Sequence, residues 1–315
     1  MTEKNLTAII PDQLAGKRLD QVLAELFPDY SRTRLKNWLL GGQIRVDGKS
    51  LKPREKVAGN ETVQLSVVLP DEEASTPEPI QLDIVFEDAA VMVINKPVGL
   101  VVHPAVGNRK GTLVNGLLYH NEALAKVPRA GVVHRLDKDT SGLMVVAKTI
   151  EAHKMLVDQL QARSVHREYR CVVQGPITAG ATINLPIGRH PVDRKRMAVV
   201  NNGKEAITHY RLLEKFTAYT YLTVKLETGR THQIRVHMSH IKHPIVGDQS
   251  YGGRLRMPKA SDALKLMIKT FPRQALHAFK LEFLHPETAE IVSFETDIPA
   301  DMEKLLSALR ENEKA

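Results

Sequence analysis

Hydrophobic residues recur at helical spacing near the start of the chain. In RLDQVLAELF, residues 18–27, the apolar positions 19, 22, 23 and 26 fall on one helical face. FPDY, residues 27–30, ends that helix, and Ser31 is a favourable N-cap for a second helix that Gly41 and Gly42 close. QIRVDGK, residues 43–49, predicts a short strand and an Asp-Gly turn. The pattern predicts a small unit of two helices and a hairpin.

The remainder of the chain alternates mostly as strands do. Residues 83–97 predict two strands around a turn, and the apolar runs 131–134 and 143–149 flank a polar loop. Alternation predicts further strands at 167–175, 207–213 and 219–227. Residues 151–163 read as a helix with Ala152, Met155, Leu156 and Leu160 on its apolar face. We therefore expect an α+β fold on a mixed, mainly antiparallel sheet.

Composition narrows the class of protein. A chain of 315 residues allows roughly two domains. Cys171 is the single cysteine, which excludes an internal disulfide and any cysteine-based zinc or iron–sulfur site. The segment MTEKNLTAIIPDQL lacks the apolar run of a signal peptide, and no run of about 18 apolar residues could span a membrane. We expect a cytoplasmic protein, and a monomer.

Charge divides the chain into segments. The net charge is +8, and residues 16–56 hold ten basic against five acidic side chains. Residues 71–88 hold seven acidic side chains and no basic one, and residues 71–79 read as an acidic, proline-rich linker. We expect a small domain over 1–70 and a large one over 80–315. The basic excess favours a polyanionic partner, most often nucleic acid.

The segment HRLDKDTSG, residues 134–142, carries the candidate chemistry. A plain hairpin between two apolar strands needs only a few turn residues, whereas this loop holds several ionisable groups. Loops held by rigid strands often carry catalytic side chains. Asp139 could simply shape the turn by bonding its own backbone. Asp137, which follows the apolar Leu136, is the better candidate for a carboxylate that points into a cleft.

Basic residues of the predicted second helix occupy a costly position. Arg32, Arg34 and Lys36 lie in its first turns, where the helix dipole disfavours cations, so they favour a role in binding a partner. A helix, an SR-x-R helix and IRVDGK together resemble the alpha-L RNA-binding domain found in a small-subunit ribosomal protein. This resemblance implies RNA binding. A generic helix–helix–hairpin with solvated basic residues is the alternative.

Longer motifs resemble one enzyme family. HRLDKDTSG, INKPVGLVVHP (94–104) and LETGRTHQIRVHMSHIKHPIVGD (226–248) are similar to motifs of the RluA-type pseudouridine synthases, and the resemblance covers essentially the whole chain. It implies an isomerase that detaches uracil at N1, rotates it and rejoins it through C5, with no cofactor and no metal. Residues 18–32, 128–149 and 273–278 look most similar to the member that modifies the helix-69 stem-loop of large-subunit (23S) ribosomal RNA. That RNA, free or within a pre-ribosomal particle, is the implied partner.

The resemblance also implies roles for individual residues. Breaking a glycosidic bond requires an ionised carboxylate near the anomeric carbon, and the family match gives this role to Asp137, as nucleophile or as the base that removes the 2′-proton. Tyr169 is implied to stack on the flipped uracil, with a hydroxyl that could assist loss of the C5 proton. Arg135 is implied to fill the vacancy left in the RNA. For Tyr169, a core tyrosine on one face of a sheet is the alternative.

Arg235 is the implied salt-bridge partner of Asp137. Helical spacing supports this role, because Ile234, Met238 and Ile241 form one face and Arg235 lies on another, towards a cleft. Arg230, at the turn before the helix, is more plausible as a phosphate or structural contact. A solvated surface arginine is the alternative for both.

Several further motifs have weaker interpretations. The loop 189–196, with Arg194 and Arg196, and the loop 252–259 are candidate RNA contacts or simply solvated loops. NKPVG, residues 95–99, with His103 and Pro104, is expected to pack beneath the 134–142 loop, in either a structural or a catalytic role. Histidines at 232, 237, 240 and 243 could suggest zinc, but the i, i+4 pair of helical ligands is absent, so we expect no metal site.

Two rival functions stay open at this point. A non-catalytic RNA-binding assembly factor could keep the same fold, although Asp137, Tyr169 and Arg235 argue against it. A hydrolase could use Asp137 and His134, but the sequence shows neither a nucleophile elbow nor a metal site.

Overall fold

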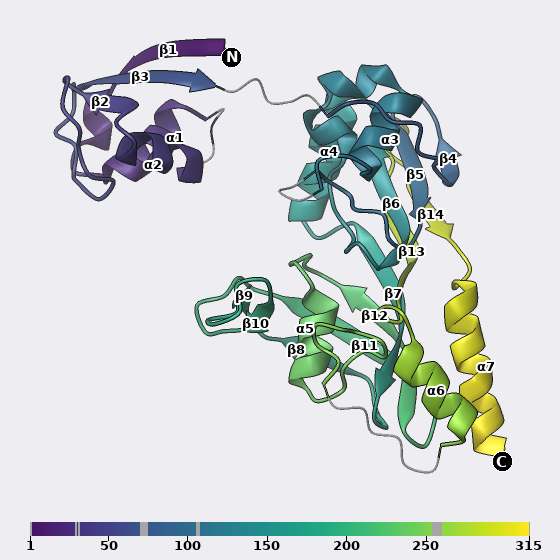
Figure 1. The fold of residues 1–315 in the computed structure, drawn as a ribbon. Coiled ribbons are helices and arrows are strands. Elements are labelled where there is room, and N and C mark those ends of the chain that lie inside the picture. The colour runs from purple at the N-terminus through teal and green to yellow at the C-terminus, as the bar shows by residue number, and fades with distance from the viewer. Residues whose placement is uncertain are drawn as a thin grey trace. The chain divides into compact units, whose positions relative to one another are not determined.

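The computed structural model describes residues 2–28, 30, 32–69, 75–104, 108–253 and 260–314. Its helices and strands are labelled in Figure 1. The chain divides into two compact units, Met1–Ala74 and Ser75–Ala315, and each has a hydrophobic core of its own. Among the described residues, no helix is both long and apolar enough to span a bilayer.

The small unit packs two helices on a three-stranded antiparallel sheet. The strands run in the order β1 (Thr2–Ile9), β3 (Thr62–Leu69) and β2 (Ile44–Val46). A 3-10 turn (Asp12–Leu14) precedes α1 (Leu19–Leu26) and α2 (Arg32–Leu40), whose apolar sides enter the core. Left-handed φ angles of 47° at Asp47 and 74° at Gly48 make the predicted turn. Ser31, the expected N-cap, lies outside the described residues.

The larger unit is built on a nine-stranded sheet. The strand order is β4-β5-β6-β13-β7-β12-β11-β8, and β14 pairs with β13. β6 and β13 pair in parallel, whereas the other neighbours pair antiparallel. The predicted α+β class with a mixed, mainly antiparallel sheet is therefore confirmed. The strands are β4 (Ile84–Glu87), β5 (Val91–Lys96), β6 (Ser141–Ala147), β7 (His166–Gln174), β8 (Ala181–Asn184), β11 (Ile207–Lys215), β12 (Tyr219–Leu226), β13 (Leu276–Leu284) and β14 (Ile291–Glu295).

Helices cover both faces of this sheet. Leu143 and Val145 of β6 pack on one side with α4 (Ile150–Gln161), while Met144 and Val146 pack on the other with α3 (Leu113–His120). This two-sided cover explains why all seven residues of β6 are buried. Figure 1 shows α5 (Gln233–His240), α6 (Asp262–Thr270) and α7 (Ala300–Lys314) towards the other end of the sheet. Two 3-10 segments (Glu122–Lys126 and Pro128–Gly131) and a small hairpin of β9 (Ile187–Arg189) and β10 (Met197–Val199) complete the unit.

Glycine is required where β6 meets β13. Gly142 has a φ of +114°, a backbone conformation that side chains with a Cβ rarely adopt. A Cβ at this position would lie 2.2 Å from the carbonyl oxygen of Ala278. The glycine of the HRLDKDTSG segment therefore lets the chain leave the polar loop and enter the sheet directly.

Three expectations differ from the structure. The run 131–134 forms no strand, because it contributes only a single bridge between Val132 and Val146. Met155 is 38% exposed, because the stripe of α4 that contacts the sheet is narrow and centres on Ala152 and Leu156. Residues 75–79, expected to be linker, are bound to α3: the Asn115 amide donates to the Thr76 carbonyl, and the Glu78 N–H donates to the Asn115 carbonyl.

Candidate active site

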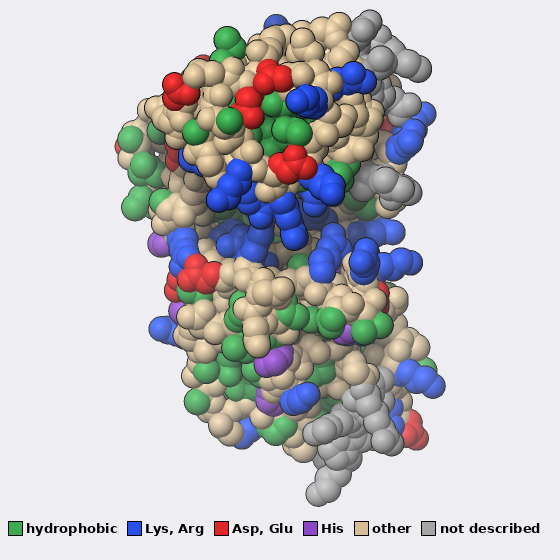
Figure 2. All heavy atoms as spheres, turned by 90° about the vertical axis from the view of Figure 1, so that its left-hand side faces the viewer, with side chains coloured by type: hydrophobic (Ala, Val, Ile, Leu, Met, Phe, Trp, Pro, Cys, Tyr) green, Lys and Arg blue, Asp and Glu red, His purple; other side chains and the backbone are tan. Residues whose placement is uncertain are grey.

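A cleft of about 1030 Å³ opens in the larger unit. Its walls come from the polar loop before β6, from β7, and from the turn that leads into α5. Positive charge dominates the lining, because six arginines face two carboxylates there: Arg129, Arg135, Arg163, Arg167, Arg230 and Arg235 against Asp137 and Glu227. Figure 2 shows many Lys and Arg side chains on the surface that it presents. The cleft is suited to a polyanion.

The NKPVG segment holds the loop that carries Asp137. The buried ammonium group of Lys96 donates to the carbonyl oxygens of Pro97, Leu100 and Lys138 at 2.8, 3.0 and 2.9 Å. The backbone N–H of Gly99 also donates to the Lys138 carbonyl, at 3.0 Å. Three carbonyls are thus gathered around one cation, which ties two segments distant in sequence. The expectation that NKPVG packs beneath this loop is confirmed.

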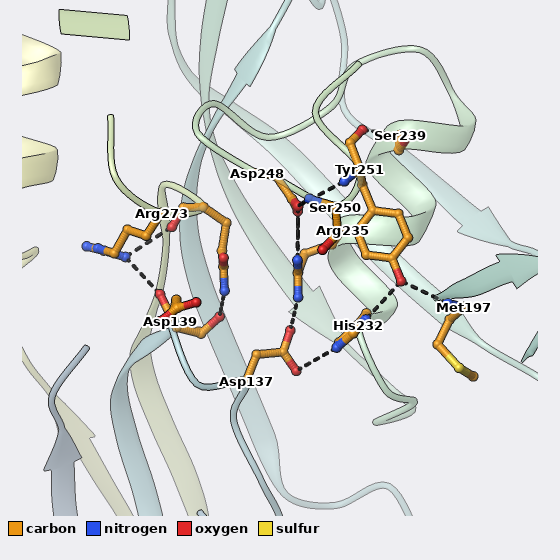
Figure 3. A network of polar contacts seen from close by, with 12 residues as sticks. Asp137, Asp139, Met197, His232, Arg235, Ser239, Asp248, Ser250, Tyr251 and Arg273 are labelled. Atoms are coloured by element: carbon orange, nitrogen blue, oxygen red, sulfur yellow. Dashed lines mark hydrogen bonds and ion pairs between the residues drawn. The ribbon is translucent and has the colours of Figure 1, made fainter. Parts of the chain in front are cut away.

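Arg273 and Gln274 bind the part of the loop that follows Asp137. Arg273 is almost fully buried and binds both carboxylate oxygens of Asp301 at 2.7 and 2.8 Å. It also donates to the Asp139 carbonyl oxygen at 3.4 Å, as Figure 3 shows. The Gln274 side chain donates to the Thr140 hydroxyl at 3.0 Å. In this arrangement Asp139 contributes its backbone carbonyl to the support, whereas Asp137 carries its carboxylate into the cleft.

Asp137 is fixed from α5. One guanidinium nitrogen of Arg235 donates to Asp137 Oδ2 at 2.9 Å, so the expected ion pair is present. The other side of the guanidinium forms two hydrogen bonds, of 2.7 and 2.9 Å, with the wholly buried carboxylate of Asp248 (Figure 3). Burial alone would lower the pKa of Arg235, but the hydrogen bonds and charges of Asp248 and Asp137 outweigh it and raise that pKa. Arg235 is a permanent cation held between two carboxylates.

His232 faces the second oxygen of Asp137. Its Nε2 lies 3.8 Å from Asp137 Oδ1, and its Nδ1 lies 2.8 Å from the Tyr251 hydroxyl. The same hydroxyl accepts a hydrogen bond from the Met197 N–H. Burial lowers the pKa of His232, although the Asp137 charge opposes the shift. We infer a neutral imidazole, and the backbone of His232 is left-handed, with φ of 57°.

Tyr169 forms another wall of the cleft. On β7 the side chains of Arg167, Tyr169 and Cys171 alternate onto the same buried face. Burial raises the pKa of Tyr169, while the charge of Arg167 lowers it and that of Asp137 raises it further. The phenol is therefore neutral at ordinary pH. Burial also raises the pKa of Cys171 to about 12, so this thiol is an unreactive core group.

The arginines predicted to contact RNA differ in exposure and in the contacts that they already make within the protein. Arg135 is exposed and lines the cleft. Arg230 also lines it, but its Nε donates to the Glu205 carbonyl at 2.9 Å, so it supports the turn as well. In the 189–196 loop, Arg194 is exposed, whereas the Arg196 guanidinium lies 5.0 Å from the Tyr251 ring centre. In the loop 252–259, residues 254–259 lie outside the described part of the chain.

In the small unit, the three basic residues of α2 have different surroundings. Arg32 is bound by the buried carboxylate of Asp20 at 2.7 Å, which limits its freedom to meet a partner. The Arg34 guanidinium lies 5.2 Å from the Trp38 ring centre. Lys36 is exposed.

The histidines near α5 serve as hydrogen-bond partners. His237 contacts the Thr208 hydroxyl at 2.9 Å and the Leu185 carbonyl at 3.0 Å, and His243 contacts the Gln174 carbonyl at 2.8 Å. No group of side chains suited to a metal ion occurs among the described residues. His134 accepts the Val145 N–H through Nε2, and burial, assisted by the Arg167 charge, lowers its pKa to about 3. It is therefore a poor general base, which weakens the hydrolase alternative.

Four supporting residues were not assigned to the site from the sequence: Asp248, Tyr251, Arg167 and Arg273. Asp248 and Tyr251 lie in a turn without periodicity, 13 and 16 positions after Arg235, so spacing does not point to them, although Asp248 is the last residue of the motif 226–248. Arg167 carried a usable signal, because it shares the strand face of Tyr169 and Cys171, where an arginine is unusual.

Comparisons with known proteins agree on one family. The family model described as RNA pseudouridylate synthase matches residues 90–240, and the S4 domain model matches residues 17–63. Relatives named ribosomal large subunit pseudouridine synthase D are 55% identical in Xanthomonas campestris and in Pseudomonas aeruginosa, over 97% and 98% of this chain and 92% and 97% of theirs. The solved structure of human RNA pseudouridylate synthase domain containing 1 aligns with a TM-score of 0.55 and 26% identity, over 74% of this chain and 96% of its own.

Proposed function

The chain belongs to the RNA pseudouridylate synthase family and is an RNA pseudouridine synthase, and we propose that it isomerises uridines of large-subunit ribosomal RNA. The observation that carries this substrate is identity of 51–56% over nearly the whole chain with relatives named ribosomal large subunit pseudouridine synthase D. Within that RNA we propose the helix-69 stem-loop, on the resemblance of residues 18–32, 128–149 and 273–278. A cytoplasmic location, a monomeric state and action on a pre-ribosomal particle stay predictions.

The reaction needs a carboxylate that is fixed but still accessible. The N1–C1′ bond breaks, the C5–C1′ bond forms, C5 loses a proton and N1 gains one, so atoms and electrons balance within the nucleoside. Because Arg235 engages Oδ2 of Asp137, Oδ1 is the oxygen left to act in the cleft. It could attack C1′ or remove the 2′-proton, and both routes use the same atom. His232 Nε2 lies 3.8 Å from Oδ1, beyond hydrogen-bond distance, so Oδ1 stays available to the substrate.

Tyr169 supplies the platform for the base. A uridine must leave its stack to enter the cleft, at a cost of a few kcal/mol that stacking on an aromatic ring recovers in part. Because burial keeps the phenol neutral, its hydroxyl can donate a hydrogen bond, and it can assist C5 deprotonation only by passing its own proton on. Arg135, exposed at the cleft, is suited to filling the gap that the extruded base leaves.

Pseudouridine mapping tests the proposal. Ribosomal RNA from a strain lacking this protein should lack pseudouridine at specific large-subunit positions, in helix 69, and the wild-type gene should restore them. Asp137→Asn, produced at the same level, should not restore them. Unchanged modification in the deletion strain would contradict the proposed substrate. Rescue of ribosome assembly by Asp137→Asn without modification would instead favour an additional, non-catalytic role in assembly.

A further inference from the structure

Three described arginines are almost wholly enclosed, and one of them differs from the others. Arg273, Arg235 and Arg167 are 3%, 6% and 8% exposed. Arg273 binds Asp301, and Arg235 binds Asp137 and Asp248. Arg167 has no carboxylate within ion-pair distance among the described residues, and its buried Nε has no hydrogen-bond partner there. Of these three arginines, Arg167 is therefore the one whose charge no carboxylate of the described residues balances.

Arg167 lies in the wall of the active-site cleft. It precedes Tyr169 by two positions on β7, so both side chains point to the same face, about 7 Å apart along the strand. Its Nη1 packs against Gly229, in the turn that leads from β12 to α5: a Cβ at position 229 would lie 2.9 Å from this nitrogen. The glycine leaves room for the guanidinium between the Tyr169 strand and the helix that carries Arg235.

An enclosed cation without a partner is costly, because burial removes hydration that nothing replaces. Burial accordingly lowers the pKa of Arg167, although the group stays charged. His134, its neighbour, adds no compensating charge because it is neutral and accepts a backbone N–H. Asp137 lines the same cleft, but its carboxylate is engaged by Arg235. An anion that enters the cleft from outside would supply the missing partner.

We propose that Arg167 binds a phosphodiester oxygen of the RNA strand next to the target uridine. This proposal rests on the proposed function, since the phosphates are the negatively charged groups that an RNA brings to the cleft. A nucleotide whose base lies on Tyr169 carries its own flanking phosphates within reach of the next side chain on that face. The planar guanidinium presents paired N–H donors that match two phosphate oxygens. Arg167 thus acts as a positioning residue: by binding the phosphate, it fixes the position of the extruded nucleotide relative to Asp137.

A double-substitution cycle between protein and RNA tests this contact. The RNA is a helix-69 fragment, either unmodified or with a neutral methylphosphonate in place of the phosphate 5′ or 3′ to the target uridine. The proteins are the full-length wild type, Arg167→Gln, Arg167→Lys and the control Arg211→Gln, in which an exposed arginine of β11 is replaced. Equilibrium binding and the single-turnover rate are measured for each combination, and thermal unfolding for each protein.

At one flanking position, the methylphosphonate should weaken the wild-type complex about 10- to 100-fold, as expected for a hydrogen-bonded charge pair. Arg167→Gln should lose a similar factor on unmodified RNA and almost nothing more on the modified RNA. Arg167→Lys should recover part of the loss, because it keeps the charge but not the paired donors. Arg211→Gln should respond to the methylphosphonate as the wild type does.

Stability separates this role from a structural one. Removing an unpaired buried cation should leave the thermal midpoint unchanged or raise it, so a markedly lower midpoint for both Arg167 variants would overturn the proposal. Losses that add at both flanking phosphates, in a wild type that does form pseudouridine, would overturn it too and would favour contact with the uracil. A wild type that makes no pseudouridine on the unmodified fragment would instead count against the proposed substrate.

Discussion

The small unit and the cleft of the larger unit both carry excess positive charge, but they hold it differently. On α2 of the small unit, Lys36 is exposed and Arg34 lies over the face of Trp38. In the cleft, Arg235 and Arg167 are 6% and 8% exposed. Exposed charges attract a polyanion over about 8–10 Å and are screened by salt. Enclosed charges act at short range in a medium that strengthens them. We expect the first kind to contribute long-range attraction for RNA, and the second to bind and orient groups close to the reacting atoms.

Asp137→Asn should have the largest effect, and it tests whether catalysis and RNA affinity depend on different charges. The change preserves shape but removes the charge that either route at C1′ requires, so we expect the single-turnover rate to fall at least about 10³-fold. RNA affinity should be unchanged or slightly higher, because it depends on phosphate contacts elsewhere. Rates and binding on a uridine-labelled ribosomal RNA fragment provide the measurement.

The neighbouring carboxylate provides the matched control. Asp139 contributes its backbone carbonyl to Arg273, which Asp139→Asn retains, so this variant should keep much more activity. Asp137→Asn should also fold, because Arg235 keeps both hydrogen bonds to Asp248. An active Asp137→Asn enzyme, or one that fails to bind RNA, would remove the reason for assigning catalysis to this residue.

Asp248→Asn should have the next largest effect, on stability. Asp248 is wholly buried, binds Arg235 twice, and accepts the backbone N–H groups of Ser250 and Tyr251. Loss of its charge leaves Arg235 with a single carboxylate, and breaking a buried pair costs about 3–5 kcal/mol. Urea-induced unfolding of the full chain should show this loss, together with a slower isomerisation rate.

An exposed ion pair provides the control for the buried pair of Asp248 and Arg235. Asp262 and Lys265 form an ion pair on α6 in which the aspartate side chain is 98% exposed. Asp262→Asn should therefore leave the urea midpoint unchanged, because water replaces the interaction. Equal destabilisation by the two substitutions would mean that burial does not decide the value of these ion pairs.

The resemblance of the chain's motifs pointed to Asp137 on its loop, to Tyr169 and to Arg235, and the spacing of residues added the faces on which the latter two lie. Helical spacing separated Arg235 from Ile234 and Met238, and strand alternation placed Tyr169 on one face of β7. Spacing could not find Asp248, because a single carboxylate in an irregular turn has no periodic signal and its partner is 13 positions away. It also predicted a strand at 131–134, where pairing is limited to one bridge. Contacts between segments distant in sequence decide both the role of Asp248 and the absence of a strand at 131–134.

Substitutions of Tyr169 separate the contribution of its aromatic ring from that of its hydroxyl. Tyr169→Leu removes both ring and hydroxyl and should cost about 1–3 kcal/mol of base affinity, whereas Tyr169→Phe retains the stacking face. If stacking is the whole contribution, the Phe enzyme should resemble the wild type in single-turnover assays. If both variants lose turnover equally while binding RNA normally, the hydroxyl is the active part and a stacking role alone is wrong.

Lys36 should give the smallest effect and tests the other side of the comparison. Each phosphate contact by an exposed cation releases counterions, so its loss reduces the slope of log affinity against log salt by about 0.7–0.9. We expect Lys36→Gln to lower RNA affinity a few-fold near physiological salt, with progressively less effect at higher salt. The isomerisation rate of bound RNA should not change, because Lys36 belongs to the small unit and not to the residues that line the cleft. Lys269→Gln, at an exposed position of α6 that does not line the cleft, is the matched control and should leave the slope unaltered. A Lys36 variant with normal affinity at every salt concentration but a slower chemical step would mean that the small unit contributes geometry rather than attraction.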